Sequence, residues 1–270
     1  RDRPGVNMYQ IMHYFEHALA NQPQIEQVIL GLDFFMFNEN LENLENFDEA
    51  RLGNKIVVED IVDNLLSIDT LKASITTFKA NLNNENKSDS KETKKSRFKR
   101  WLTNFLSYEG FYGEYDLSQA KLKNLQAIVD KCKQHNIELI VFISPNHATQ
   151  YEAIIVSGLW QTFEQWKREV IKISPFWDFS GYNSITTESI SDRMDNYIDN
   201  SHYSLRVGDL VLSRMLSFQT DKVPEDFGIV VTSENIESHL NQVRLDREIW
   251  REEHPEEVNL VKTIKAKTNN

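Results

Sequence analysis

Two short runs of aliphatic residues constrain the fold of this chain more than any other feature. The segment 25–37 has the apolar centre VIL at 28–30, and the segment 137–143 reads IELIVFI. Runs of this length that are rich in β-branched residues are typical of strands covered on both faces. Strands of this kind occur where helices lie above and below a sheet, so the pattern predicts an α/β protein.

The segments around these strands have the spacing of amphipathic helices. Apolar residues recur at helical intervals in 8–19, which Asn7 is expected to cap, and in 118–135, where Cys132 falls on the buried stripe. Further elements are expected as helices at 38–82, 150–172, 205–217 and 233–252, and as strands at 176–179 and 227–232. The alternation predicts right-handed crossovers and a three-layer αβα sandwich with a parallel sheet.

The length and composition suit one large domain with an appendage. The chain has 270 residues, of which 40% are hydrophobic, so it can bury a sizeable core. We assign residues 1–222 to the α/β domain and residues 223–270 to a C-terminal extension of a strand and a helix. The polar, partly basic stretch 83–100 is predicted to be an inserted loop. It contains a basic cluster of Lys94, Lys95, Arg97, Lys99 and Arg100, which is interpreted as a charged loop edge, with a binding patch as the minor alternative.

The charge balance excludes one class of partner. Lys and Arg number 30, Asp and Glu number 41, and the net charge is -11. A nucleic-acid binder needs a basic face that displaces counterions from phosphates, so we expect no nucleic acid as partner. The single cysteine excludes an internal disulfide and a cysteine-clustered zinc site. No apolar run approaches the roughly 20 residues that span a bilayer.

Polar residues follow the carboxyl ends of the predicted strands, where ligands bind in open α/β sheets. Gly31–Asp33 follows the first strand, Ser144–His147 the second, and Asp178–Ser180 the third. A fourth polar set, Asp199–His202, precedes the helix expected at 205–217. These four sets supply the candidate site residues.

The spacing of Asp199 and His202 is the sharpest of these motifs. An Asp three residues before a His, on a turn that leads into a helix, can place its carboxylate on the imidazole Nδ1. That contact fixes the tautomer and leaves Nε2 free to act as a base. D-x-x-H also occurs by chance in surface turns. The functional interpretation therefore depends on the position of the motif near the end of a doubly wound domain.

This arrangement resembles the SGNH (GDSL-type) hydrolase and acyltransferase superfamily, in which D-x-x-H precedes the last helix of a sandwich of flavodoxin-like topology. The resemblance implies that Asp199 and His202 are catalytic and that Gly5, before the first helix, contributes to an oxyanion hole. The G-x-N-D block of the superfamily falls on Gly31-Leu32-Asp33-Phe34. Its nucleophilic Ser would precede Gly5. Because the sequence starts at Arg1 without an initiator Met, we expect a fragment of a longer protein.

Longer segments resemble a narrower group of bacterial SGNH-like proteins of unassigned function, which begin with a membrane anchor. The matching segments are Gly31–Asn38, Ile143–Ala148, Trp166–Arg168, Phe176–Tyr182 and Asp199–Tyr203. The resemblance implies an anchored protein on the extracytoplasmic, periplasmic or cell-envelope side, with its anchor in a segment N-terminal to this chain. Related acyltransferases modify exopolysaccharides and cell walls.

Asp33 departs from the pattern of the superfamily. An Asn amide at this position donates a hydrogen bond to the oxyanion, whereas a carboxylate donates only when it is protonated. The alternatives are a protonated Asp33, a different donor, or a site that no longer transfers acyl groups. Loss of one donor typically costs roughly 2.7–4 kcal/mol of transition-state stabilisation, which lowers activity without abolishing it.

The other candidates have both structural and functional interpretations. Ser144, Asn146 and His147 form either a structural turn or part of the site lining, and a nucleophilic Ser144 is the minor alternative. The site lining is further predicted to include Asp178, Ser180 and Tyr203.

Three functions are compatible with this sequence. The favoured one is an ester hydrolase or O-acyltransferase that acts on a polysaccharide, a cell-envelope substrate or a small acylated molecule, without a metal or other cofactor. In it, His202 is the general base and acid, and a Ser upstream of this chain is the nucleophile. The alternative is a non-catalytic relative that binds a glycan or a partner in a polysaccharide export or modification assembly. A third, weaker alternative is a metal-dependent hydrolase that uses Asp33, Asp178, Asp199 and His202.

Overall fold

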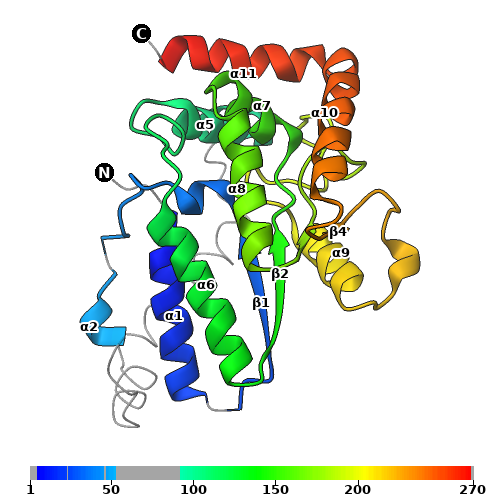
Figure 1. Ribbon diagram of the computed structural model, residues 1–270. Helices are drawn as coiled ribbons and strands as arrows, with labels where there is room; N and C mark the ends of the chain where they lie inside the picture. The colour runs from blue at the N-terminus through cyan, green and yellow to red at the C-terminus, as the bar shows by residue number, and fades with distance from the viewer. Residues whose placement is uncertain (1–4, 23, 46, 53–91, 269–270) are drawn as a thin grey trace, which may run out of the picture.

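The computed structural model describes residues 5–22, 24–45, 47–52 and 92–268 (Figure 1). They form an α/β fold with a mixed, mostly parallel four-stranded sheet flanked by helices. The strands are β1 (Gln27–Leu32), β2 (Glu138–Ile143), β3 (Phe176–Asp178) and β4 (Ile229–Val231). The helices are α1 (Met8–Asn21), α2 (Glu49–Leu52), α5 (Lys94–Leu106), α6 (Gln119–Gln134), α7 (Ala148–Val156), α8 (Trp160–Ile173), α9 (Leu205–Met215), α10 (Ile236–Glu253) and α11 (Pro255–Thr268).

The strands lie in the order β1-β2-β3-β4, and the first three are parallel. Leu32 lies opposite Ile143, which lies opposite Asp178, so the three carboxyl ends meet at one edge of the sheet. The expectation of a parallel sheet is wrong for β4, which is antiparallel to β3. The chain between α9 and β4 returns to the carboxyl edge, where Asp226 accepts a hydrogen bond from the backbone N–H of Ser184 at 2.7 Å, so β4 runs in the opposite direction.

Alternate residues of β1 and β2 face two different layers. Leu30 and Val141 belong to the larger core cluster, which α1, α6 and α8 cover. Ile29 and Ile140 point to the opposite side, where they pack with buried residues of α9 such as Val207. Both strands are therefore covered on both faces, which explains why their sequences are continuously apolar. The predicted α/β class is confirmed.

The local patterns locate several elements well. The helices predicted at 8–19 and 118–135 are confirmed as α1 and α6, and Asn7 caps α1 by accepting from the backbone N–H of Gln10 at 3.1 Å. The helix predicted at 150–172 is instead two helices, α7 and α8, because Gly158 between them has a φ of 75° in the left-handed region.

The predicted loop at 83–100 is wrong from Lys94 onwards, because the basic cluster lies on helix α5. Thr93 caps this helix, and its buried face consists of Phe98, Leu102, Phe105 and Leu106. The helix predicted at 38–82 is represented among the described residues only by α2, because 38–45 and 47–48 are not helical. Residues 53–91, which contain the rest of that prediction, lie outside the described part.

The C-terminal segment 223–270 contributes buried residues to the core. Besides β4, it forms α10 and a further helix, α11, which the sequence analysis did not predict. Pro255 opens α11, where its fixed φ and missing N–H are tolerated. Helix α11 lies across α5 and α7 (Figure 1), and Thr268 Oγ1 donates to the backbone oxygen of Leu106 at 3.2 Å. None of the described helices is both long enough and apolar enough to cross a membrane.

Candidate functional site

Asp33, Ser144 and Asn146 meet at the carboxyl edge of the sheet. They follow the paired ends of β1 and β2, so the register of the two strands places them side by side. Asn146 Nδ2 donates to Asp33 Oδ1 at 2.8 Å, and Ser144 Oγ donates to Asp33 Oδ2 at 3.3 Å. Both carboxyl oxygens therefore accept hydrogen bonds, which is the pattern of an ionised carboxylate.

The pKa of Asp33 reflects opposing influences. Burial raises the pKa, whereas the hydrogen bonds from Asn146 and Ser144 and the positive charge of His202 lower it, with a net increase above the ordinary value. The Tyr203 ring also lies within the influence of this carboxylate, since burial and the Asp33 charge raise the pKa of Tyr203. His202 and Tyr203 thus lie on the same side of the sheet as Asp33.

A tight turn holds the Asp199 carboxylate in place. Its Oδ1 accepts from the backbone N–H groups of Ser201 and His202, each at 2.9 Å, as in turns closed by an Asp side chain. Nδ1 of His202 lies 2.9 Å from both carboxyl oxygens. The Asp199 side chain is 3% exposed and that of His202 is 55% exposed, so a buried carboxylate orients an exposed imidazole.

The imidazole of His202 is held from one side only. The hydrogen bond to Asp199 raises its pKa, burial opposes this, and the charge of Asp33 adds to the increase. The Trp101 ring packs edge-on against it, with ring centroids 5.0 Å apart. In the described part of the chain, no hydrogen-bond partner lies on Nε2. The ring is therefore oriented as a general base requires, with one nitrogen open.

The described residues do not place a serine hydroxyl on Nε2 of His202. Ser144 Oγ donates to Asp33 instead, and Ser201 Oγ lies 3.3 Å from Nδ1, on the side that faces Asp199. The dyad is consequently present here without a bonded nucleophile among residues 5–22, 24–45, 47–52 and 92–268.

Both ring nitrogens of His147, which lies behind this edge, have hydrogen-bond partners. Its Nδ1 accepts from the backbone N–H of Thr149 at 3.2 Å and so caps α7, while Nε2 lies 2.7 Å from the backbone oxygen of Glu188. Burial lowers the pKa of His147 to about 4, which keeps the ring neutral.

Gly5 is buried between the Phe35 and Phe111 rings, where an added Cβ would lie 2.7 Å from Phe111.

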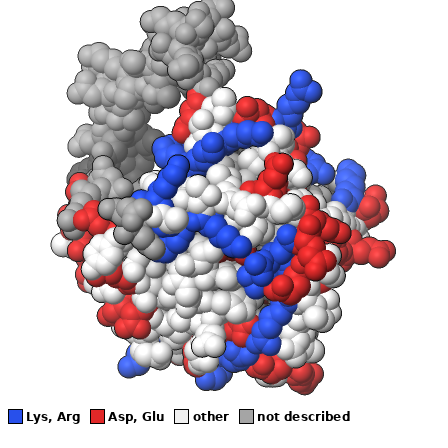
Figure 2. All heavy atoms as spheres, turned by 90° about the horizontal axis from the view of Figure 1, so that it is seen from above, with Lys and Arg blue, Asp and Glu red and all other residues white. Residues whose placement is uncertain are grey.

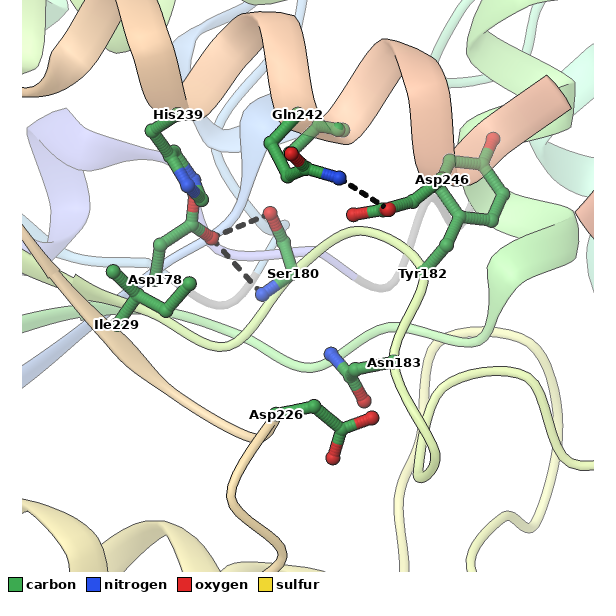
Figure 3. Close-up of a pocket in the computed structure, with 10 residues that line it drawn as sticks. Asp178, Ser180, Tyr182, Asn183, Asp226, Ile229, His239, Gln242 and Asp246 are labelled. Atoms are coloured by element: carbon green, nitrogen blue, oxygen red, sulfur yellow. Dashed lines mark hydrogen bonds and ion pairs between the residues drawn. The ribbon is translucent and has the colours of Figure 1, made fainter. Parts of the chain in front are cut away.

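Asp178 and Ser180 belong to a separate buried network (Figure 3). Lys167 Nζ lies 2.6 Å from Asp178 Oδ2 and 2.8 Å from Ser180 Oγ. His239 Nε2 lies 2.7 Å from the same Asp178 Oδ2, and the Ser180 hydroxyl donates to Asp178 Oδ1 at 2.5 Å. Burial would raise the pKa of Asp178, but Lys167 and His239 hold it well below its usual range.

This network lies beneath a small pocket whose other walls come from α10 and the β4 region. Figure 3 shows Gln242 and Asp246 on the helix above Ser180, and Asp226 on the opposite side. The hydrogen bonds of this network and those around Asp33 and Asp199 share no residue. Asp178 and Ser180 therefore belong to a different hydrogen-bonded network from the His202 dyad.

The four residues of the metal hypothesis are not gathered around one point. Among the described residues, no group of three or more His, Cys, Asp or Glu side chains is arranged to hold a metal ion. The metal-dependent alternative therefore lacks a ligand set in this part of the molecule.

Four contributors to these sites, Trp101, Arg100, Lys167 and His239, were not predicted as site residues. Trp101 was placed between predicted elements and Arg100 at the edge of a predicted loop, so neither was considered beside His202. His239 lies 61 residues from Asp178, and no local pattern links them.

Comparisons with protein-family models, curated proteins and solved structures found no match. The fold and the side-chain geometry are therefore the basis for any functional conclusion.

Proposed function

We propose that this chain is part of an SGNH-like ester hydrolase or O-acyltransferase that acts on the O-acyl groups of a polysaccharide or another cell-envelope substrate. The observation that carries the proposal is the Asp199–His202 pair, with Nδ1 held and Nε2 open beside the carboxyl edge of the sheet. The D-x-x-H resemblance supplies the reaction class. The proposal includes an extracytoplasmic location and an N-terminal anchor.

In this mechanism, His202 transfers protons while Asp199 stays ionised. Nε2 takes the proton of a serine hydroxyl as its oxygen attacks the ester carbonyl, and the resulting imidazolium returns that proton to the leaving alkoxide. An acceptor hydroxyl or water then attacks the acyl-enzyme with the same assistance. The serine belongs to a segment N-terminal to this chain, and Ser144 is the alternative nucleophile.

Asn146 is the amide donor that we assign to the oxyanion in place of the usual Asn. An amide has two N–H donors, and Asp33 accepts one of them at 2.8 Å. The second N–H is then available to a developing oxyanion, together with the backbone N–H of Gly5. Asp33 acts as a positioning residue that orients the donor, and it need not be protonated.

The test is acetyl-ester hydrolysis and transfer by the protein with its natural N-terminal segment. His202→Ala should abolish turnover, whereas His135→Ala, a change of an exposed histidine at the end of α6, should leave it unchanged. The serine of the added segment should be required for turnover, and Ser144→Ala identifies the alternative nucleophile. Unchanged turnover by His202→Ala would refute the assignment.

A non-catalytic glycan or partner binder is the second candidate. Two observations favour it: the described residues place no hydroxyl on His202 Nε2, and Asp33 accepts hydrogen bonds where the superfamily has a donor. Under this alternative, the protein with its N-terminal segment binds its glycan or assembly partner but shows no turnover that depends on His202.

A further inference from the structure

Helix α5 is strongly basic in an acidic protein. Its first seven residues include five basic residues and no acidic one, although the whole chain has a net charge of -11. The basic residues, called the α5 basic row below, are Lys94, Lys95, Arg97, Lys99 and Arg100. On the face seen from above in Figure 2, Lys and Arg side chains are visible together with Asp and Glu side chains.

The stability of the helix does not account for this charge. The N-terminus of a helix carries a partial positive charge and favours acidic residues, but Lys94 and Lys95 occupy the first turn of α5. The helix dipole and the basic row therefore add to the same positive potential. Glu92 offsets part of it, since it pairs with Arg100 at 2.9 Å and with Arg97 at 3.6 Å.

Two members of the row are free to meet a ligand. Lys95 and Lys99 are exposed, and in the described part of the chain no carboxylate lies within 4.0 Å of either Nζ. Asp192 is near, but it accepts from the backbone N–H of Lys95 at 3.1 Å and not from its ammonium group. These lysines therefore project unpaired charge into solvent.

Contacts of Arg100 and Trp101 link the row to the dyad. The Arg100 guanidinium lies 5.7 Å from the centroid of the Trp101 ring, which packs against His202. The hydrogen bond to Glu92 is the main cause that raises the pKa of Arg100, and the charge of Asp199 adds a smaller contribution. Helix α5 thus lies next to the Asp199–His202 dyad, which it contacts through the Trp101 ring.

We propose that the α5 basic row and Trp101 bind an anionic glycan, a sugar polymer that carries carboxylate or phosphate groups, and present it to His202. The inference rests on the proposed function for what happens at His202. Lysine and arginine attract both anionic groups, and the indole offers an apolar face beside them for a sugar ring.

An anionic membrane fits the row less well than a glycan does. A membrane-surface helix needs an exposed apolar face, but Phe98, Leu102, Phe105 and Leu106 of α5 are all buried in the protein. Nucleic acid is the other polyanion that these basic side chains could attract. Vesicles and DNA are therefore competing ligands in the test.

The test compares two double charge reversals of equal size in the protein with its N-terminal segment. Lys95→Glu/Lys99→Glu changes the row, and Lys123→Glu/Lys133→Glu changes two exposed lysines on α6. Binding is measured by calorimetry to polygalacturonate, phosphorylated dextran, neutral dextran, anionic vesicles and single-stranded DNA, at about 50 and about 200 mM salt. Thermal unfolding verifies that both variants fold.

We expect the carboxylated or the phosphorylated glycan to bind, with affinity that falls at the higher salt concentration. The α5 variant should weaken binding roughly tenfold or more, and the α6 variant much less. Equal effects of the two variants, equal binding of neutral dextran, or tighter binding of vesicles or DNA that depends on the row would each overturn the proposal.

His202→Ala separates this inference from the proposed function. The variant should bind the anionic glycan normally and fail to hydrolyse its esters. Ester hydrolysis of a small neutral substrate without any glycan binding would refute the inference alone. Glycan binding that depends on the row, without any turnover that depends on His202, would refute the enzymatic proposal alone.

Discussion

The molecule contains two Asp–His pairs whose surroundings are opposite. In Asp199–His202 the imidazole is 55% exposed and is bonded through Nδ1 only. In Asp178–His239 the imidazole is 8% exposed, and the carboxylate also receives Lys167 and Ser180. The Asp199–His202 pair thus leaves one imidazole nitrogen without a hydrogen-bond partner among the described residues, whereas in the Asp178–His239 pair the carboxylate is surrounded by buried partners.

The difference shows that an Asp–His contact does not by itself mark a reactive site. The Asp178 network joins the end of β3 to α8 and α10, and each oxygen of its carboxylate already has two partners. It suits a structural role, since a buried charge must be paired. Asp199 uses its bonds to orient one ring whose far nitrogen stays free, which suits chemistry.

The largest effect is expected from Asp199→Asn in the protein with its N-terminal segment. The amide cannot stabilise the imidazolium and favours the wrong tautomer, so kcat should fall by about 10⁴-fold. Chemical unfolding should change little, because the amide oxygen of Asn can still accept the hydrogen bonds from the backbone N–H groups of Ser201 and His202. A fall of less than tenfold in ester turnover would show that the open pair is not the catalytic one.

Lys167→Met should have the largest effect on stability. It leaves the fully buried Asp178 carboxylate without its main countercharge, and the loss of one partner of a buried pair costs about 3–5 kcal/mol. Urea unfolding measures the change. The double variant Lys167→Met/Asp178→Asn removes both charges and should recover part of the loss; if it unfolds as easily as the single variant, the pairing explanation is wrong.

Asn146→Ala tests the oxyanion assignment at the open site. Removal of an oxyanion donor lowers kcat by about 10²–10³-fold, and KM should change little because the interaction forms in the transition state. Asn241→Ala, a change of an exposed amide on α10, is the matched control. An equal loss in kcat and in binding of the unreacted ester would assign Asn146 to ground-state binding.

The pH profile should show the smallest of these effects. Asp199 raises the pKa of His202 above 6.5, and only the neutral ring accepts a proton. The rate should therefore rise with pH through a midpoint above 6.5, and Lys95→Glu/Lys99→Glu should move that midpoint upward by adding negative charge near the ring. An unchanged midpoint for this variant would place the row electrostatically far from His202.

Much of the fold could be predicted because its determinants are local. The aliphatic runs of β1 and β2 and the cap of α1 depend on a few neighbouring residues. The direction of β4 could not be predicted, because it depends on where the loop through Asp226 returns. Helix α5 was predicted to be a loop because its first turn is charged and its apolar face begins only at Phe98.

The candidate site divides in the same way. Asp199 and His202 lie only three positions apart in one turn, so the D-x-x-H spacing was enough to predict the contact. The surroundings of Asp178 depend on Lys167 and on His239 of a later helix. Its assignment to the site lining was therefore based on its place at a strand end, without the partners that determine its charge state.

The packing of α11 on α5 has a consequence for how the protein reaches its working form. Helix α11 is close to the end of the described chain, yet it supports the helix that carries Arg100 and Trp101, and Lys265 Nζ donates to the backbone oxygen of Leu106 at 3.2 Å across 159 positions. Contacts this distant in sequence form late in folding, because the long stretch of chain between them must close first. We expect the parallel strands to form before α5 and α11 pack together, so that the edge that carries Arg100 and Trp101 becomes ordered last.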